Sequence, residues 1–125
     1  MLTSRAMTAK DPDGLALLRN ALRQFAAERD WDQFHSPKNL ASALAVEAAE
    51  LLERFQWLTE DQSRNLPPAE LTRVRQEMAD VLNYLVRLAD KLDVDLLDAA
   101  RDKIVLNAQK YPVEKARGSA RKYSD

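Results

Sequence analysis

The sequence predicts an all-α protein, most simply a four-helix bundle, and three observations favour this fold class. Apolar residues recur at steps of three and four over long stretches, which is the spacing of one helix face. No stretch has the strict apolar–polar alternation of a half-buried strand. Of the 125 residues, 46% are hydrophobic and 31% are charged, the balance of a globular domain. A chain of this length gains core if the bundle is completed by oligomerisation.

The first two helices are each predicted from a cap and a proline. The first follows the segment DPDG, where Asp11 can cap and Pro12 suits the opening turn. The second begins at SPKNL, with Ser36 as the cap and Pro37 at the first position, and extends to about Leu58. The segment TEDQSRNLPP that comes next is predicted to be a loop.

The third helix has the most regular pattern. Its apolar residues alternate steps of three and four, the heptad seam of a helix packed in a bundle: Leu71, Val74, Met78, Val81, Leu85, Leu88 and Leu92. The fourth helix follows Asp93 and ends before Tyr111 and Pro112. Four of its residues are predicted to point inward: Leu97, Ala100, Ile104 and Ala108. The expected organisation is a flexible N-terminus at 1–12, a helical domain at 13–111 and a basic tail at 112–125.

Composition excludes several classes of protein. A formal net charge of −1 gives no electrostatic case for binding nucleic acid or a membrane surface. The absence of cysteine excludes disulfides and thiolate metal sites, and two glycines are too few for a Gly-rich phosphate loop. His35 is the only histidine, which rules out HExxH zinc chemistry and disfavours a di-iron bundle. No apolar run resembles a signal peptide or a membrane span, so a cytoplasmic location is expected.

Acidic residues stand where two helices are expected to face the bundle interior. Glu47 and Glu50 lie three residues apart on one helical face, and Glu77 and Asp80 repeat that relation beside the heptad seam. Like charges in a low-dielectric site repel one another and lose hydration, at a cost of roughly several kcal/mol per uncompensated ion. Protons, basic side chains or a bound cation can relieve that cost. Arg54 is the only nearby base on the second helix and lies outside the Glu47–Glu50 row.

A hard divalent cation is the most economical solution for an all-oxygen site. Magnesium is the first choice, with manganese or calcium as alternatives. Glu53 extends the acidic row and is a further ligand, a base for water or an exposed residue. The competing interpretation is that both acidic pairs lie on ordinary solvated helix faces, where glutamate is common.

Aromatic and basic residues near the carboxylates suggest a nucleotide. Magnesium in proteins usually meets substrate phosphates, and flat rings can stack on a base. The aromatic candidates are Trp31, Phe34, His35, Trp57 and Tyr84. Basic and amide candidates for a polyphosphate are Lys103, Asn107, Lys110, Lys115, Arg117, Arg121 and Lys122. Each of these residues taken alone is equally well explained as a core, loop or solvated residue.

The motif EAAE at Glu47–Glu50, followed by EMAD at Glu77–Asp80, resembles the ExxE…ExxD signature of the MazG-like, all-α nucleoside triphosphate pyrophosphohydrolases. The segments DWDQFH, FQW and KYPVEKARGSA are similar to the dCTP pyrophosphatase branch, and the resemblance covers about residues 13–123. It implies the helical bundle shared by MazG and dimeric dUTPases, assembled as a homodimer or homotetramer. It also implies hydrolysis of a deoxynucleoside triphosphate, dCTP or a modified dCTP, to the monophosphate and pyrophosphate in nucleotide-pool house-cleaning.

The resemblance also implies roles for particular residues. Glu47, Glu50, Glu77 and Asp80 match magnesium ligands, and Glu50 or Glu53 is the candidate to orient or deprotonate the attacking water. The residues that match a nucleotide-binding role are Trp31, Asp32, Gln33, Phe34, His35, Trp57, Tyr84, Lys103, Asn107 and Tyr111. The dCTP branch carries a nucleotide-contacting histidine where Leu22 stands here, so the base preference stays open. Two other classes compete with the enzyme: a nucleotide-binding module without turnover, and a plain interaction bundle.

Overall fold

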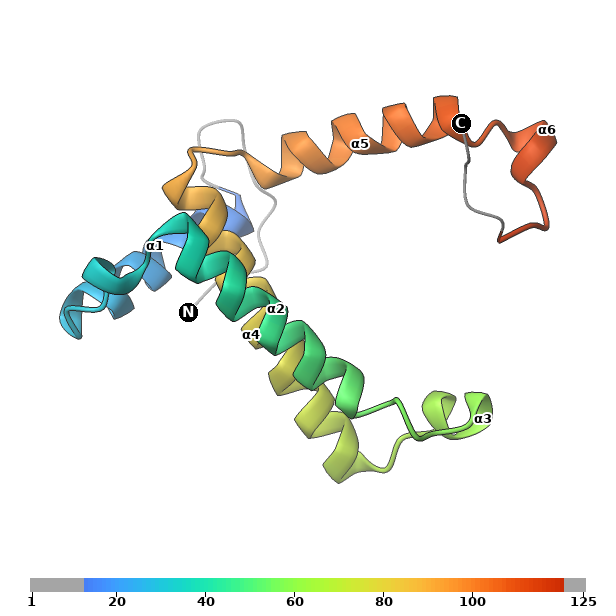
Figure 1. The fold of residues 1–125 in the computed structure, drawn as a ribbon, viewed down its shortest axis with the longest axis horizontal. Coiled ribbons are helices and arrows are strands. Elements are labelled where there is room, and N and C mark those ends of the chain that lie inside the picture. The colour runs from blue at the N-terminus through green and yellow to red at the C-terminus, as the bar shows by residue number, and fades with distance from the viewer. Residues whose placement is uncertain (1–12, 121–125) are drawn as a thin grey trace. The chain divides into compact units, whose positions relative to one another are not determined.

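A computed structural model describes residues 13–120, and this part of the chain contains helices and connecting segments without a strand. The all-α class predicted from the sequence is therefore confirmed. The elements in chain order are α1 (Gly14–Glu28), the short 3-10 helix η1 (Asp32–Phe34), α2 (Pro37–Glu53), α3 (Glu60–Arg64), α4 (Pro68–Lys91), α5 (Leu96–Lys110) and α6 (Val113–Ala116). Figure 1 shows them coloured along the chain.

The chain divides into two compact units at the bond between Asp93 and Val94. The first unit contains α1, η1, α2, α3 and α4, and the second contains α5 and α6. The domain limits expected from the sequence, with a helical domain over 13–111 and a tail over 112–125, stay a prediction. The flexible N-terminus expected at 1–12 lies outside the described residues.

Side-chain caps set the starts of the helices. The Ser36 hydroxyl accepts a hydrogen bond from the Asn39 backbone N–H at 3.1 Å, and Pro37 opens α2, as predicted. The carboxylate of Asp13 caps α1 by accepting from the Ala16 N–H at 2.7 Å. The prediction placed this cap at Asp11, which lies outside the described residues.

Two predictions about the segment after α2 are wrong. α2 ends at Glu53 and not near Leu58, because the chain tightens into turns in which the N–H groups of Arg54, Phe55 and Leu58 donate to the carbonyl three residues earlier. The predicted loop contains α3, which a capping box starts. The Thr59 side chain accepts from the Gln62 N–H, and the Gln62 side chain accepts from the Thr59 N–H.

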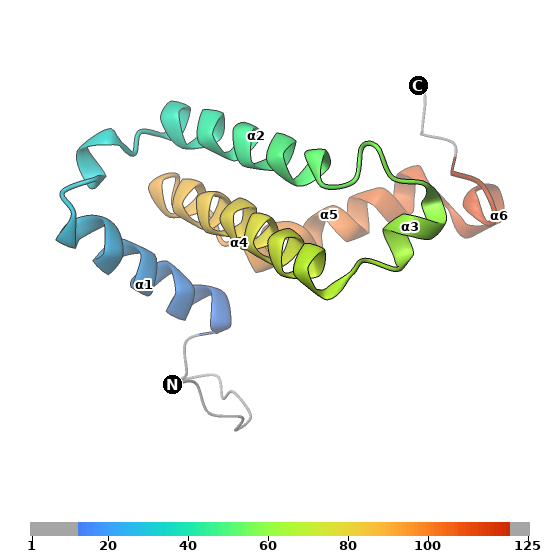
Figure 2. The same cartoon turned by 90° about the horizontal axis from the view of Figure 1, so that it is seen from below.

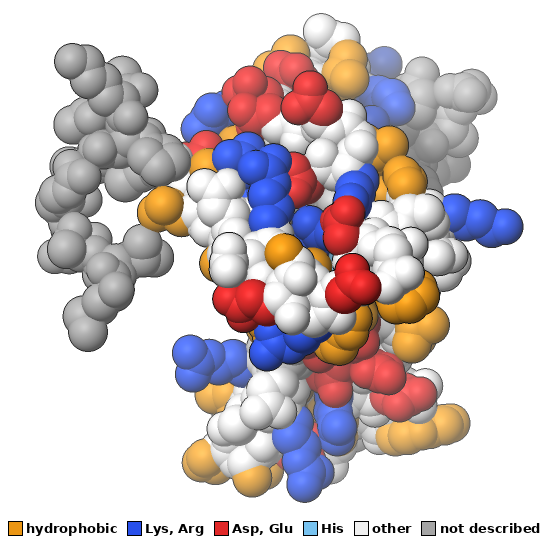
Figure 3. All heavy atoms as spheres, turned by 90° about the vertical axis from the view of Figure 1, so that its left-hand side faces the viewer, with side chains coloured by type: hydrophobic (Ala, Val, Ile, Leu, Met, Phe, Trp, Pro, Cys, Tyr) orange, Lys and Arg blue, Asp and Glu red, His pale blue; other side chains and the backbone are white. Residues whose placement is uncertain are grey.

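The first unit is built on the pairing of α2 with α4. These helices run antiparallel side by side, and α1 packs against α4 (Figures 1 and 2). The buried apolar side chains of the described residues are few: Ala26, Leu40, Val74, Val86 and Ala89. Acidic, basic and hydrophobic side chains are interspersed on the face drawn in Figure 3, in agreement with the net charge of −1.

The heptad seam of α4 is only half covered within one chain. Val74 is buried and Val81 and Leu88 are half-buried. The alternate seam positions remain open, with exposures of 55%, 57%, 37% and 54% at Leu71, Met78, Leu85 and Leu92. A row of apolar residues at every seventh position, open to solvent along a helix, is the pattern of a surface that packs against another helix.

The second unit contains the long helix α5 and the short helix α6. Asp95 caps α5 by accepting from the Asp98 N–H, and the helix ends at Lys110 with Tyr111 as the C-cap residue, as predicted. The prediction that Leu97, Ala100, Ile104 and Ala108 point into a core is not met within the second unit: Leu97 is half-buried and the other three are exposed. α6 lies inside the predicted tail, and Arg121 and Lys122 lie outside the described residues.

None of the described helices combines the length and the apolar composition that crossing a bilayer requires.

Candidate functional site

The antiparallel packing of α2 on α4 brings acidic side chains from both helices together. Glu47 of α2 and Glu77 and Asp80 of α4 each offer a carboxylate oxygen, and these three atoms lie within 4.8 Å of one another. Glu50 adjoins them, because its carboxyl group interacts with those of both Glu47 and Glu77. The two i, i+3 pairs singled out in the sequence therefore meet in space. We call these four residues the carboxylate cluster.

The carboxylate cluster is under electrostatic strain. Burial raises the pKa of Glu47 to about 7, and the neighbouring Glu50, Asp80 and Glu77 add to the effect. Burial, followed by the Glu50 carboxyl, also raises the pKa of Glu77. Both shifts have the same physical cause: negative charges crowd together in a place where water reaches them poorly.

The donor set of the cluster fits a hard divalent cation. The Oε2 atoms of Glu47 and Glu77 are buried and have no hydrogen-bond partner among the described residues. Arg54 reaches the cluster, with its Nη2 atom 3.9 Å from Glu77 Oε1, although the sequence placed it outside the acidic row. One guanidinium cannot neutralise four carboxylates. Unpartnered oxygens with a surplus of negative charge are what a magnesium or manganese ion would satisfy.

A cavity of about 420 Å³ opens beside the carboxylate cluster. Its walls come from α1, from the segment between α1 and α2, and from α4: Ala21, Leu22, Phe25, Ala26, Trp31, His35, Asp80, Asn83, Tyr84 and Arg87. Phe25 and Trp31 meet edge to face with their ring centroids 5.7 Å apart. Asp80 belongs to both the cavity wall and the cluster, so a molecule in the cavity would lie next to a cation held by the cluster.

The residues predicted to bind substrate fall into three groups. Trp31, His35 and Tyr84 line the cavity. Outside its wall lie Asp32, whose carboxylate binds Arg87 and Lys91, and Gln33, whose amide donates to Asp30. Phe34 and Trp57 are exposed and also lie outside the wall. Lys103, Asn107 and Tyr111 belong to the second unit.

Glu53, the alternative base, is exposed at the end of α2 and is not part of the cluster.

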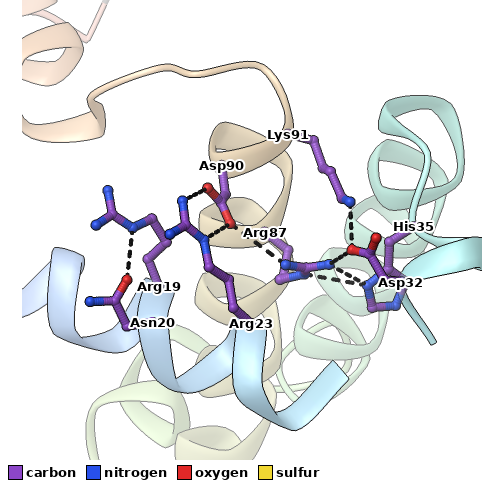
Figure 4. A network of polar contacts seen from close by, with 8 residues as sticks. All are labelled: Arg19, Asn20, Arg23, Asp32, His35, Arg87, Asp90 and Lys91. Atoms are coloured by element: carbon purple, nitrogen blue, oxygen red, sulfur yellow. Dashed lines mark hydrogen bonds and ion pairs between the residues drawn. The ribbon is translucent and has the colours of Figure 1, made fainter. Parts of the chain in front are cut away.

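Sequence reasoning missed Arg87, Asn83 and Phe25 in the cavity wall. Arg87 is only 5% exposed and is the centre of a polar network that joins α1, η1 and α4 (Figure 4). The signal was present in the spacing, because Asp80, Asn83, Tyr84 and Arg87 occupy positions i, i+3, i+4 and i+7 of one helix face.

Comparisons with known proteins agree with this fold and identify the family. The sequence profile of the MazG-like family matches residues 43–125, and the chain belongs to this family. It is 49% identical over 110 residues to dCTP pyrophosphatase 1 of Mus musculus and 44% identical to that of Homo sapiens. In both cases 86% of this chain matches 65% of the relative, so the chain spans about two thirds of the length of these curated relatives.

A solved structure extends the agreement to three dimensions. A pyrophosphatase from Archaeoglobus fulgidus superposes with a TM-score of 0.77 at 36% identity, covering 85% of this chain and 99% of the other. The MazG-like resemblance predicted from the acidic motifs is thereby confirmed.

The raised pKa of Glu47 predicts how the metal-free protein responds to pH. A carboxyl group whose pKa is 4.5 when unfolded and about 7 when folded binds more protons in the folded state. The free energy of unfolding is therefore not reduced by this group below about pH 4.5. It falls as the pH rises from about 4.5 through about 7, because the group must then ionise inside the folded protein. Glu47→Gln cannot ionise, so this variant should unfold at a higher temperature than the wild type near pH 8 in chelator and should show a flatter pH profile.

Differential scanning calorimetry between about pH 5 and pH 8 would measure this effect. Glu28→Gln, which removes a carboxylate at an exposed position on α1, is the matched control and should follow the wild type. Identical profiles for Glu47→Gln and Glu28→Gln would show that the cluster carries no electrostatic strain.

Proposed function

We propose that the protein is a divalent-metal-dependent nucleoside triphosphate pyrophosphohydrolase. Its substrate would be a deoxynucleoside triphosphate, dCTP or a modified dCTP, and its products the monophosphate and pyrophosphate, in house-cleaning of the nucleotide pool. The observation that carries this proposal is that Asp80 joins the carboxylate cluster to a cavity of about 420 Å³ with an aromatic wall. The activity named for the relatives, dCTP pyrophosphatase, is the same.

Glu47, Glu50, Glu77 and Asp80 would hold Mg²⁺, and Mn²⁺ could replace it because both ions take oxygen ligands. The bound ion would neutralise phosphate charge as it develops in the transition state. A cluster with unpartnered buried oxygens is prepared for such an ion before it arrives, because few hydrogen bonds must be broken to bind it.

The chain's own residues would orient the substrate and the water. The aromatic side chains of Phe25, Trp31 and Tyr84 line the cavity and would offer an apolar surface for the base. Glu50 is the better of the two candidates to deprotonate the attacking water, because it adjoins Glu47 and Glu77 while Glu53 is exposed. Asp32, Gln33, Phe34, Trp57, Lys103, Asn107 and Tyr111 remain proposed nucleotide contacts by resemblance.

A substrate panel with product identification tests this function. With magnesium, the wild type should convert at least one deoxynucleoside triphosphate to monophosphate and pyrophosphate. Asp80→Asn should lower kcat by about a hundredfold or more, because loss of a ligand removes several kcal/mol of charge stabilisation. Asp61→Asn, at an exposed position on α3, should leave the rate unchanged.

Other results would favour a different reaction or a different class of protein. Release of diphosphate and orthophosphate would exclude attack at the α-phosphorus. Binding without any product would favour a nucleotide-sensing module. No magnesium-dependent stabilisation would favour a plain interaction bundle.

We also propose that the active form is a homodimer or a homotetramer in the cytoplasm, with no nucleic acid or membrane partner. The open half of the α4 seam and the small buried core both favour a second copy of the chain. A second copy would cover the apolar positions that a single chain leaves open to water.

Leu71→Glu should therefore weaken assembly, because it places a charge in the seam that a second copy would remove from water. Thr72→Glu adds the same charge to the adjacent, polar position of α4 and should leave assembly intact. Sedimentation velocity across a concentration series would measure both. A wild type that stays monomeric at all concentrations, or a Leu71→Glu variant that assembles like Thr72→Glu, contradicts this use of the seam.

A further inference from the structure

The imidazole of His35, the only histidine of the chain, lies between the cavity and a buried arginine. The ring lines the cavity wall, and its Nδ1 atom faces Arg87. Arg87 Nε donates to Nδ1 at 3.3 Å, and Arg87 Nη2 lies 3.1 Å from the same atom. Figure 4 shows the guanidinium directed at one edge of the ring. The other ring nitrogen, Nε2, has no hydrogen-bond partner among the described residues.

Arg87 is held on every side. Its Nη2 atom donates to Asp32 Oδ1 at 2.9 Å, and its Nη1 atom lies 3.6 Å from Asp90 Oδ2. Asp90 is fixed in turn by the guanidinium of Arg23 on α1, whose Nε donates at 2.7 Å. A guanidinium that is 5% exposed and paired with two carboxylates is costly to move, because a displaced charge would remain buried without a partner.

This arrangement selects one tautomer of His35. An arginine has five N–H donors and no acceptor, so the atom it faces must accept. Nδ1 therefore carries no proton, and the single proton of the neutral ring must be on Nε2. Burial, together with the charge of Arg87, lowers the pKa of His35, which favours the same neutral ring.

The distance between His35 and the carboxylate cluster indicates which part of a nucleotide would lie next to His35. Asp80, at the cluster, and Arg87, at His35, are seven residues apart on α4, which corresponds to about 10.5 Å along a helix axis. In the proposed function, a cation at the cluster would hold the phosphates, so the far end of the cavity would receive the part of the nucleotide remote from them. The apolar side chains of Leu22 and Phe25 in the same wall suit a base and not a phosphate.

We propose that Arg87 is a positioning residue, which fixes His35 as the Nε2–H tautomer so that the imidazole donates a hydrogen bond to an acceptor atom of the nucleobase. The proposal rests on the proposed nucleotide function and adds a specificity rule to it. A base that presents a carbonyl oxygen or an unprotonated ring nitrogen at this edge should bind more tightly than a base that presents an amino group there.

The tautomer can be read directly, because a single histidine gives unambiguous signals. Nitrogen-15 NMR of the metal-free full chain near pH 8 should show a pyridine-like Nδ1 and a protonated, pyrrole-like Nε2. Arg87→Met should lose this preference and give a mixture of tautomers. Lys91→Met is the matched control, because Lys91 binds Asp32 in the same network without a hydrogen bond to His35. A protonated Nδ1 in the wild type overturns the proposal, whether or not the protein hydrolyses triphosphates.

The consequence for the ligand is tested by binding, without turnover. The probe is α,β-methylene-dCTP with Mg²⁺, in which the bond to be cleaved is blocked, and its Kd is measured by calorimetry. His35→Leu removes the donor and should weaken binding by about tenfold. His35→Gln keeps an amide that can accept from Arg87 and donate into the cavity, and it should stay within about threefold of the wild type.

Each outcome of the binding series decides the matter. Loss in His35→Leu with rescue in His35→Gln, and a similar loss in Arg87→Met, supports the proposal. If Arg87→Met fails to fold, the two His35 variants still give the answer. Equal affinity of His35→Leu and the wild type, or no binding to the wild type, overturns it. A wild type that binds the analogue and hydrolyses no triphosphate contradicts the proposed function and leaves the binding role of His35 standing.

Discussion

Repulsion among acidic side chains is the constraint on which the rest of this structure depends. The helices α2 and α4 pack antiparallel, and their contact places Glu47, Glu50, Glu77 and Asp80 in one group. A bundle built only for stability would put apolar residues at such positions, because like charges with poor access to water oppose folding. A cation bound at the cluster would remove this repulsion, and an ion that binds only the folded state stabilises it.

In the first unit, charged side chains are arranged differently at two places along α4. At one end, carboxylates outnumber their single basic neighbour, Arg54. Two helical turns further on, opposite charges are paired, because Asp32 binds Arg87 and Lys91. Asp90 in turn binds Arg87 and Arg23. The cavity extends between an unbalanced end, suited to a metal and phosphates, and an end with paired charges, suited to an uncharged base. In the proposed function, one helix face would thus order the parts of a nucleotide without a dedicated phosphate loop.

Local patterns were readable from the sequence, and contacts between distant segments were not. The pairs Glu47–Glu50 and Glu77–Asp80 could be predicted because a helix brings residues three apart onto one face. Arg87 was missed because its partner Asp32 is 55 positions away, in a segment whose fold no periodicity reveals. The inward face predicted for α5, including Ile104, needs a surface to cover it, and the second unit by itself does not supply one. Trp57 stays a predicted nucleotide contact, and it is 86% exposed in the segment that follows the end of α2.

The central claim is that the carboxylate cluster is a divalent cation site. The most direct test is to titrate chelator-treated protein with Mn²⁺ and to measure binding by electron paramagnetic resonance. The account predicts saturable Mn²⁺ binding that Mg²⁺ displaces, with affinity that rises from about pH 6 to pH 8 as the cluster loses its protons. Glu77→Gln should weaken that binding by about tenfold or more. Equal Mn²⁺ affinity in the wild type and Glu77→Gln, or no saturable binding at all, would contradict it.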